Sequence, residues 1–203
     1  MMIRLLLVIT ILGLISCGER PTSNSVESGS STALKPADAP DGITIERQTQ
    51  PDTIKKSIRA LAQGTIGKTN ISITYHSPAV RGRIIWGGLV PYDQVWVTGA
   101  HMATTIRFDA ELELMGKPLP AGQYALFTIP GKDTWTVIVN QNWQQHLTDE
   151  YDAALDVIRF EVKPIQETEP QERLRYAIIE TEAGGVITMQ WEKLKIEIPV
   201  SGQ

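Results

Sequence analysis

Apolar and polar residues alternate along much of the chain beyond residue 70. In the segment 70–75, Ile71, Ile73 and Tyr75 share one face, and polar residues occupy the other. This period of two is typical of β-strands with one face in a core and the other in solvent. The sequence predicts strands at 70–75, 104–108, 111–114, 123–129, 134–140, 156–162, 174–180, 186–191 and 194–198.

Helical periodicity is weak. Residues 52–62 fit either one short helix, with Asp52 as its cap, or an edge strand. Residues 142–154 suggest at most a helical turn, and the polar run 167–172 is expected to be a solvated loop. We therefore predict an all-β fold, an antiparallel β-sandwich or jelly roll of about ten strands with at most one or two short helices. The sequence leaves a barrel open as the alternative.

The N-terminus has a different character. One basic residue, Arg4, precedes the apolar run Leu5–Ile15, and Ser16 and Cys17 follow that run. Because a membrane span needs about 20 apolar residues, a run of 11 is too short to cross a bilayer. A charged start, a short apolar run and a small residue before a cleavage site are typical of a signal peptide, here residues 1–16.

The sequence Leu14-Ile15-Ser16-Cys17 resembles a bacterial lipoprotein signal. The resemblance implies that Cys17 carries lipid and anchors the mature protein to a membrane of the bacterial cell envelope, since two or more acyl chains anchor stably. Gly18 replaces the Asp that resembles an inner-membrane retention signal, which favours the outer membrane. The alternative is a secreted protein with one free thiol.

Residues 17–42 are expected to form a flexible tether that begins at lipidated Cys17. Eleven of the 25 residues 18–42 are Gly, Ser or Pro, and none is aromatic. Such a segment buries too little apolar surface to offset its ordering entropy. All 13 aromatic residues lie between Tyr75 and Trp191, so we expect residues 43–203 to form a single folded domain.

The composition and the residue spacings argue against several classes of function. A net charge of −4 without a basic stripe argues against nucleic-acid binding. One cysteine excludes an intramolecular disulfide and a Cys-rich zinc site. The spacing of His76, His101 and His146 matches no metal motif, and no nucleophile elbow or phosphate-binding glycine loop is present. We therefore expect no metal and no cofactor.

The segment 76–105 combines Gly, Pro, aromatic, Arg and His residues, as loops that bind ligands often do. Arg83 offers a fork for an anion, Tyr92 and Trp96 offer flat surfaces, and His101 offers a proton carrier near neutral pH. Thr98 and Thr104 are further binding candidates, although threonines in loops more often satisfy backbone groups.

Longer motifs carry a second resemblance. Between residues 82 and 104 they are Gly82-Arg83, Gly87, Val90-Pro91-Tyr92, Val95-Trp96, Thr98-Gly99-Ala100 and Ala103-Thr104. They continue with Gly116-Lys117-Pro118-Leu119, Ala121-Gly122-Gln123-Tyr124, the run from Leu126 to Gly131, Trp135-Thr136-Val137-Ile138 and Trp191-Glu192-Lys193. Over about residues 50–200 the chain resembles a bacterial envelope family known as domain of unknown function 2911.

The resemblance implies a β-rich secreted or lipid-anchored protein without an assigned activity. Val97, His101 and Met102 depart from the pattern, which usually has Arg, Asn and Glu at these positions. The loss of Arg and Glu together removes a potential ion pair. A polar site in this segment would therefore differ here from its usual form.

Three functions remain open. The first is a non-enzymatic binding domain, in which residues 76–105 take a small polar or glycan ligand or an envelope protein partner. The second is an envelope hydrolase, in which His101 is the general acid or base and Arg83 stabilises negative charge. The third is a structural component of the envelope. The sequence favours the first and leaves catalysis uncertain.

Overall fold

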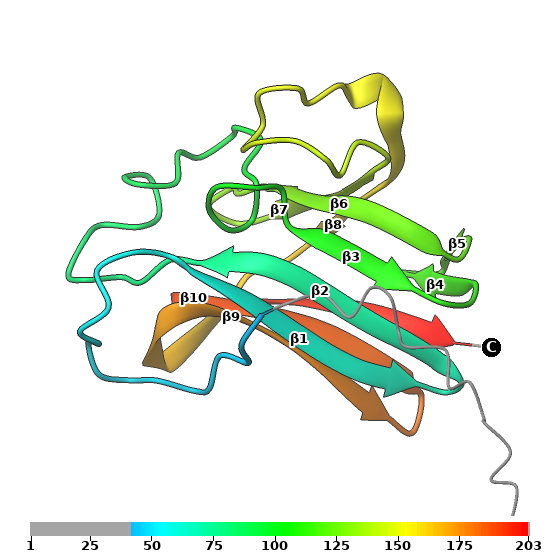
Figure 1. The fold of residues 1–203 in the computed structure, drawn as a ribbon, viewed down its shortest axis with the longest axis horizontal. Helices are drawn as coiled ribbons and strands as arrows, with labels where there is room; N and C mark the ends of the chain where they lie inside the picture. The colour runs from blue at the N-terminus through cyan, green and yellow to red at the C-terminus, as the bar shows by residue number, and fades with distance from the viewer. Residues whose placement is uncertain (1–41, 203) are drawn as a thin grey trace, which may run out of the picture. The chain divides into compact units, whose positions relative to one another are not determined.

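The computed structural model describes residues 42–202, which fold into two antiparallel sheets (Figure 1). In order across the first sheet lie β1 (Ile58–Ile66), β2 (Thr69–Ser77), β3 (Thr105–Phe108), β6 (Gly122–Ile129), β7 (Trp135–Asn140) and β8 (Asp156–Val162). The second contains β5 (Lys117–Leu119), β4 (Leu112–Leu114), β10 (Gly184–Gly202) and β9 (Ile165–Thr181).

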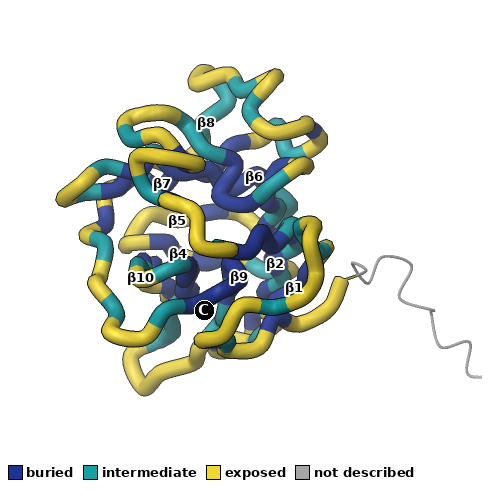
Figure 2. The backbone as a smooth tube through the Cα atoms, turned by 90° about the vertical axis from the view of Figure 1, so that its left-hand side faces the viewer, coloured by how far each residue is buried: buried dark blue, intermediate teal, exposed yellow. Residues whose placement is uncertain are grey.

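Alternation along the strands builds the core between the sheets. In β2 every second residue is buried, so Ile71, Ile73 and Tyr75 point inward as predicted. They join one apolar cluster with Leu112 of β4 and Ile187 of β10, on the opposing sheet. Figure 2 shows this buried backbone enclosed by exposed turns. The predicted all-β sandwich of about ten strands is confirmed, and the two sheets do not close into a barrel.

Strands β6 and β7 are buried more completely than an alternating pattern requires. Their outer face is covered by a second apolar cluster, which includes Val97, Ala103 and Phe127. Trp143 and Tyr151 pack against it from the loop between β7 and β8. This covering explains why Leu126 and Phe127, and likewise Val137, Ile138 and Val139, follow one another with no polar residue between them.

The helix expected as one option at 52–62 does not form. Strand β1 begins at Ile58 and lies at the edge of the six-stranded sheet, so the edge-strand alternative was the correct one. Within 142–154, regular helix is limited to the start of a 3-10 turn, Ala153–Leu155, whose N–H at Ala154 donates to Asp152 Oδ1. No helix within residues 42–202 is long and apolar enough to cross a membrane.

The expectation of a loop at 167–172 is wrong, because these residues belong to β9. Gln171 and Arg173 are almost completely buried, and Glu172 is nearly so. Their polar groups make hydrogen bonds inside the protein. The segments 186–191 and 194–198, predicted as two strands, are one strand, β10, whose register with β9 shifts on both sides of Glu192.

Several expectations concern the N-terminus. The signal peptide at 1–16, the lipidated Cys17 and the tether at 17–42, except for its last residue, lie outside the described residues.

Candidate functional site

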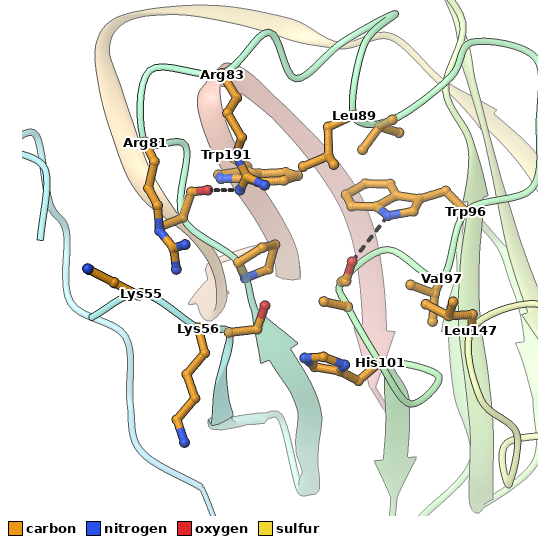
Figure 3. Close-up of a pocket in the computed structure, with 16 residues that line it drawn as sticks. Lys55, Lys56, Arg81, Arg83, Leu89, Trp96, Val97, His101, Leu147 and Trp191 are labelled. Carbon is orange, nitrogen blue, oxygen red and sulfur yellow. Dashed lines mark hydrogen bonds between the residues drawn. The ribbon is translucent and has the colours of Figure 1, made fainter. Parts of the chain in front are cut away.

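A cavity of about 550 Å³ opens where the long connection between β2 and β3 crosses one end of the sandwich (Figure 3). Arg83, Trp96 and His101, all predicted as binding residues, line it together. The remaining lining comes from Lys55, Lys56, Ser57, Pro78, Ala79, Arg81, Leu89, Val90, Val97, Gly99, Ala100, Leu147 and Trp191. Its volume is in the range of pockets that hold small molecules.

One part of the wall is aromatic. Trp96 stacks on Trp191, with centroids 6.0 Å apart and an interplanar angle of 19°. Trp86 meets both rings edge to face, with centroids 5.8 and 5.9 Å away, and Trp135 meets Trp96 and Trp86 edge to face at 6.3 and 4.8 Å. Trp96 is only partly buried, and its Nε1–H donates to Gly99 O at 3.2 Å. The arrangement holds a flat apolar surface rigidly at the cavity.

The opposite part is cationic. Lys55, Lys56, Arg81 and Arg83 lie on one side in Figure 3, and Leu89, Trp96, Val97 and Leu147 lie on the other. Arg83 donates from Nε to Val80 O at 3.1 Å and from Nη2 to Ala79 O. Arg81 donates from Nη2 to Ile54 O at 3.0 Å. None of these four cations forms an ion pair within residues 42–202.

The loop that carries Lys55 and Lys56 is held in place by hydrogen bonds from the buried side chain of Arg173. Arg173, 1% exposed, donates to Asp52 from Nε and from Nη2, the latter at 3.0 Å. The same guanidinium donates to the backbone oxygens of Ile54, Lys56 and Ser77. It therefore ties the loop to the end of β2. Hydrogen bonds from Arg173 lower the pKa of Asp52, which stays ionised.

His101 lies on the cavity wall with its backbone in the left-handed region, at φ 62°. Its ring meets the ring of His76 edge to face, with centroids 5.3 Å apart. Partial burial, with smaller effects from His101 and Arg59, lowers the pKa of His76. Among the described residues, none hydrogen-bonds the His101 ring, so the structure provides no partner that would orient it for proton transfer.

Thr98 and Thr104, also predicted as binding residues, are buried and do not line the cavity. Thr98 Oγ1 lies 3.0 Å from Thr128 Oγ1 and donates to Trp96 O. Thr98 O accepts hydrogen bonds from Thr104 Oγ1 at 3.1 Å and from Tyr176 OH at 2.9 Å. These bonds stabilise the left-handed turn at Thr98, with φ 52°, and so shape the loop beneath the cavity.

Tyr92 does not reach the cavity. Its ring packs over Gly87, where an added Cβ would lie 2.8 Å from Tyr92 Cε2. Gly87 has φ 75°, a conformation that glycine adopts without strain. Tyr92 therefore closes a turn, and glycine is required beneath it.

Sequence reasoning missed Lys55, Lys56, Arg81, Trp191 and the Arg173–Asp52 pair. The two adjacent lysines are visible in the sequence, but they read as part of a short helix or an edge strand. Arg173 follows a run of polar residues that indicates solvent rather than a core. Nothing in one sequence shows that two segments more than 100 residues apart meet.

Within the described part of the chain, no group of three or more His, Cys, Asp or Glu side chains is placed to hold a metal ion. Comparison with protein families gives a match over residues 57–200 to a family described as "Protein of unknown function (DUF2911)". Comparisons with curated proteins and with solved structures give no match.

Proposed function

Because the chain belongs to the DUF2911 family of proteins of unknown function, we propose its function from the cavity: it is a non-enzymatic domain that binds a small polar ligand there. One observation carries the proposal. Arg83, Trp96 and His101, which the sequence marked within 76–105, line a single cavity with Lys55, Lys56 and Arg81. A cavity with a rigid aromatic wall and several polar groups is the usual form of a small-molecule site.

The geometry favours binding over hydrolysis. General acid–base catalysis needs a proton carrier held in a defined orientation. The nearest ring to His101 that the structure records is His76, at an edge-to-face distance of 5.3 Å. Two nitrogen atoms of Arg83 donate to backbone oxygens, so its guanidinium is held in place as a fixed positive charge at the edge of the cavity.

The test is thermal unfolding of the purified protein with sugars, peptides, organic anions and divalent cations. A ligand at 100 times its dissociation constant adds about 2.7 kcal/mol to the free energy of unfolding. We expect at least one class of ligand to raise the midpoint of thermal unfolding of the wild type. The same ligand should not raise the midpoint of Leu89→Trp, because the larger tryptophan side chain occupies part of the cavity.

Ile84→Trp is the matched control, because Ile84 lies in the same turn, is 78% exposed and does not line the cavity. A midpoint shift that persists in Leu89→Trp would place the ligand elsewhere. If no class shifts the midpoint, the proposal fails and a structural role in the envelope becomes the better account.

We also propose that the protein is anchored to the bacterial outer membrane through lipid on Cys17. The support is the sequence alone, in which Leu14-Ile15-Ser16-Cys17 follows a short apolar run. In cells that make the protein, Cys17→Ser is expected to abolish labelling by a radioactive fatty acid and to remove the protein from the outer-membrane fraction. An unlabelled wild-type protein would contradict the proposal.

A further inference from the structure

The lining of the cavity is divided by chemistry. Arg81 and Arg83 from one loop and Lys55 and Lys56 from another provide four positive charges, the two exposed lysines at the rim with their ammonium ends extended outward in Figure 3. Of the described residues that line the cavity, none is acidic, although the whole chain carries a net charge of −4. Clustered charges of one sign beside apolar walls concentrate the electrostatic potential in a cleft.

The two carboxylates near the cavity, those of Asp52 and Glu172, accept hydrogen bonds from other groups. Asp52 binds the buried guanidinium of Arg173. Glu172 is 6% exposed and accepts the backbone N–H of Arg81 at 3.0 Å. Neither lines the cavity. None of the four cations therefore forms an ion pair in the described part of the chain, although the charge of Arg81 contributes to the lowered pKa of Asp52.

The two guanidinium groups retain unused donors. Arg83 donates hydrogen bonds from Nε and Nη2 to backbone oxygens, and Arg81 donates one from Nη2. Nη1 of Arg83 and both Nε and Nη1 of Arg81 have no acceptor within residues 42–202. Such N–H groups form short, charge-assisted hydrogen bonds with carboxylate, sulfonate or phosphate oxygens.

The facing wall suits a different part of a ligand. Leu89, Val97 and Leu147 supply aliphatic surface, and Trp96 supplies a ring already fixed by stacking on Trp191. A flat apolar group gains both buried area and ring stacking on such a wall. A fully hydrated polar molecule would gain little from it.

Resting on the proposed function, we propose that the natural ligand class is a small organic anion, in which a flat apolar body carries a carboxylate, sulfonate or phosphate. The anionic end binds Lys55, Lys56, Arg81 and Arg83, and the apolar body lies against Trp96, Leu89 and Leu147. The division of the cavity thus specifies both ends of the ligand.

The test uses two fluorescent probes with the same aromatic body. 1-Anilinonaphthalene-8-sulfonate carries a negative charge, and N-phenyl-1-naphthylamine is neutral. We expect the wild-type protein to bind the sulfonate at one saturable site and about tenfold more tightly than the neutral probe. Inorganic phosphate is expected to compete only weakly, because it lacks the apolar body.

Two variants test the cationic side. Lys55→Ala combined with Lys56→Ala is expected to weaken the sulfonate about tenfold and to change the neutral probe by less than about twofold. Lys68→Ala combined with Lys163→Ala removes the same charge from exposed positions outside the cavity and is expected to change neither. Leu89→Gln should weaken the sulfonate and the neutral probe alike through the lost apolar contact, and Leu89→Glu should weaken the sulfonate further, because it adds a negative charge.

Four results would overturn the inference. Equal affinity for both probes, unaffected by the lysines, would remove the requirement for charge and leave the proposed function standing. Phosphate that binds as tightly as the sulfonate would remove the requirement for an apolar body. Sulfonate binding that responds equally to the control lysines would be non-specific. Failure of both probes would also reject the inference, while the thermal-unfolding panel would still judge the proposed function.

Discussion

Arg173 and Asp52 are 121 positions apart in the chain, and the guanidinium of the first binds both carboxylate oxygens of the second. Arg173 is buried, whereas the Asp52 side chain keeps 17% of its surface exposed. The pair joins the loop before β1 to the middle of β9. Since the same loop carries Lys55 and Lys56, this contact fixes part of the cavity rim.

Asp52→Asn should destabilise the fold. The change leaves a buried guanidinium without its counter-charge, and such a loss costs about 3–5 kcal/mol. Because Asp52 is partly exposed and Arg173 keeps its backbone acceptors, we expect about 3 kcal/mol, measured by urea unfolding. Asp149→Asn is the matched control, since its carboxylate pairs with His146 at an exposed site and should change stability by less than about 0.5 kcal/mol. Equal effects would contradict the assignment.

Acid should weaken the protein through the same contact. Hydrogen bonds and charge from Arg173 hold the pKa of Asp52 below its ordinary value of 3.8. The unfolded chain therefore binds this proton first, and the stabilisation present above pH 3.8 is lost as the pH falls through the lowered value. The free energy of unfolding should fall more steeply with acid in the wild type than in Asp52→Asn.

Asp109 provides an internal check on the acid experiment. The side-chain Nδ2–H of Asn70 at 2.7 Å and its backbone N–H at 2.8 Å donate to the Asp109 carboxylate and lower the pKa of Asp109 as well. This contribution should persist in Asp52→Asn, so the variant should keep part of the acid dependence. Identical slopes in the two proteins would show that Asp52 makes no contribution.

Tyr176→Phe should cost about 1 kcal/mol, the usual net value of one buried hydrogen bond. The variant removes the O–H that donates to Thr98 O at 2.9 Å and keeps the ring that packs edge to face on Tyr75. Thr98 O retains Thr104 Oγ1 as its donor. Urea unfolding gives the cost, and Tyr92→Phe is a control that alters a partly buried tyrosine away from this network. A neutral Tyr176→Phe would mean that the bond adds no stability.

Met115→Asn should stabilise the protein by about 0.5–1 kcal/mol. Met115 and Gly116 connect β4 to β5 with φ values of 52° and 71°, as a two-residue type I′ hairpin turn requires. Asparagine tolerates this left-handed conformation better than methionine does. Met102→Asn is the control, because Met102 is similarly exposed but has no positive φ. A decrease in the thermal midpoint of Met115→Asn would contradict this account.

The alternation of Ile71, Ile73 and Tyr75 was sufficient to predict a strand and its buried face, because one face of β2 meets the core. The expected strand at 156–162 matches β8 at both ends. Gln171 and Arg173 show why other parts failed. They are buried by contacts with Asp52 and with the backbone near Glu46, and a hydrophobic pattern carries no information about polar groups satisfied at long range.

The residues of the candidate site also fall into those that the sequence could predict and those that it could not. Arg83, Trp96 and His101 lie within one unusual segment, so local composition could mark them. Lys55, Lys56 and Trp191 reach the cavity only through the packing of β9, β10 and the loop before β1. Thr98 and Thr104 share the composition of the marked segment, but their hydroxyl groups are turned into the fold.

Four of the five tryptophans form one cluster, with ring centroids between 4.8 and 6.3 Å for the pairs in contact. At such separations, light energy absorbed by one indole migrates to its neighbours before it is emitted. The emission of the cluster is therefore depolarised even when the protein tumbles slowly. A molecule that quenches the fluorescence of Trp96 therefore also lowers the emission of Trp86, Trp135 and Trp191. The intrinsic fluorescence of the protein thus reports whether the cavity is occupied.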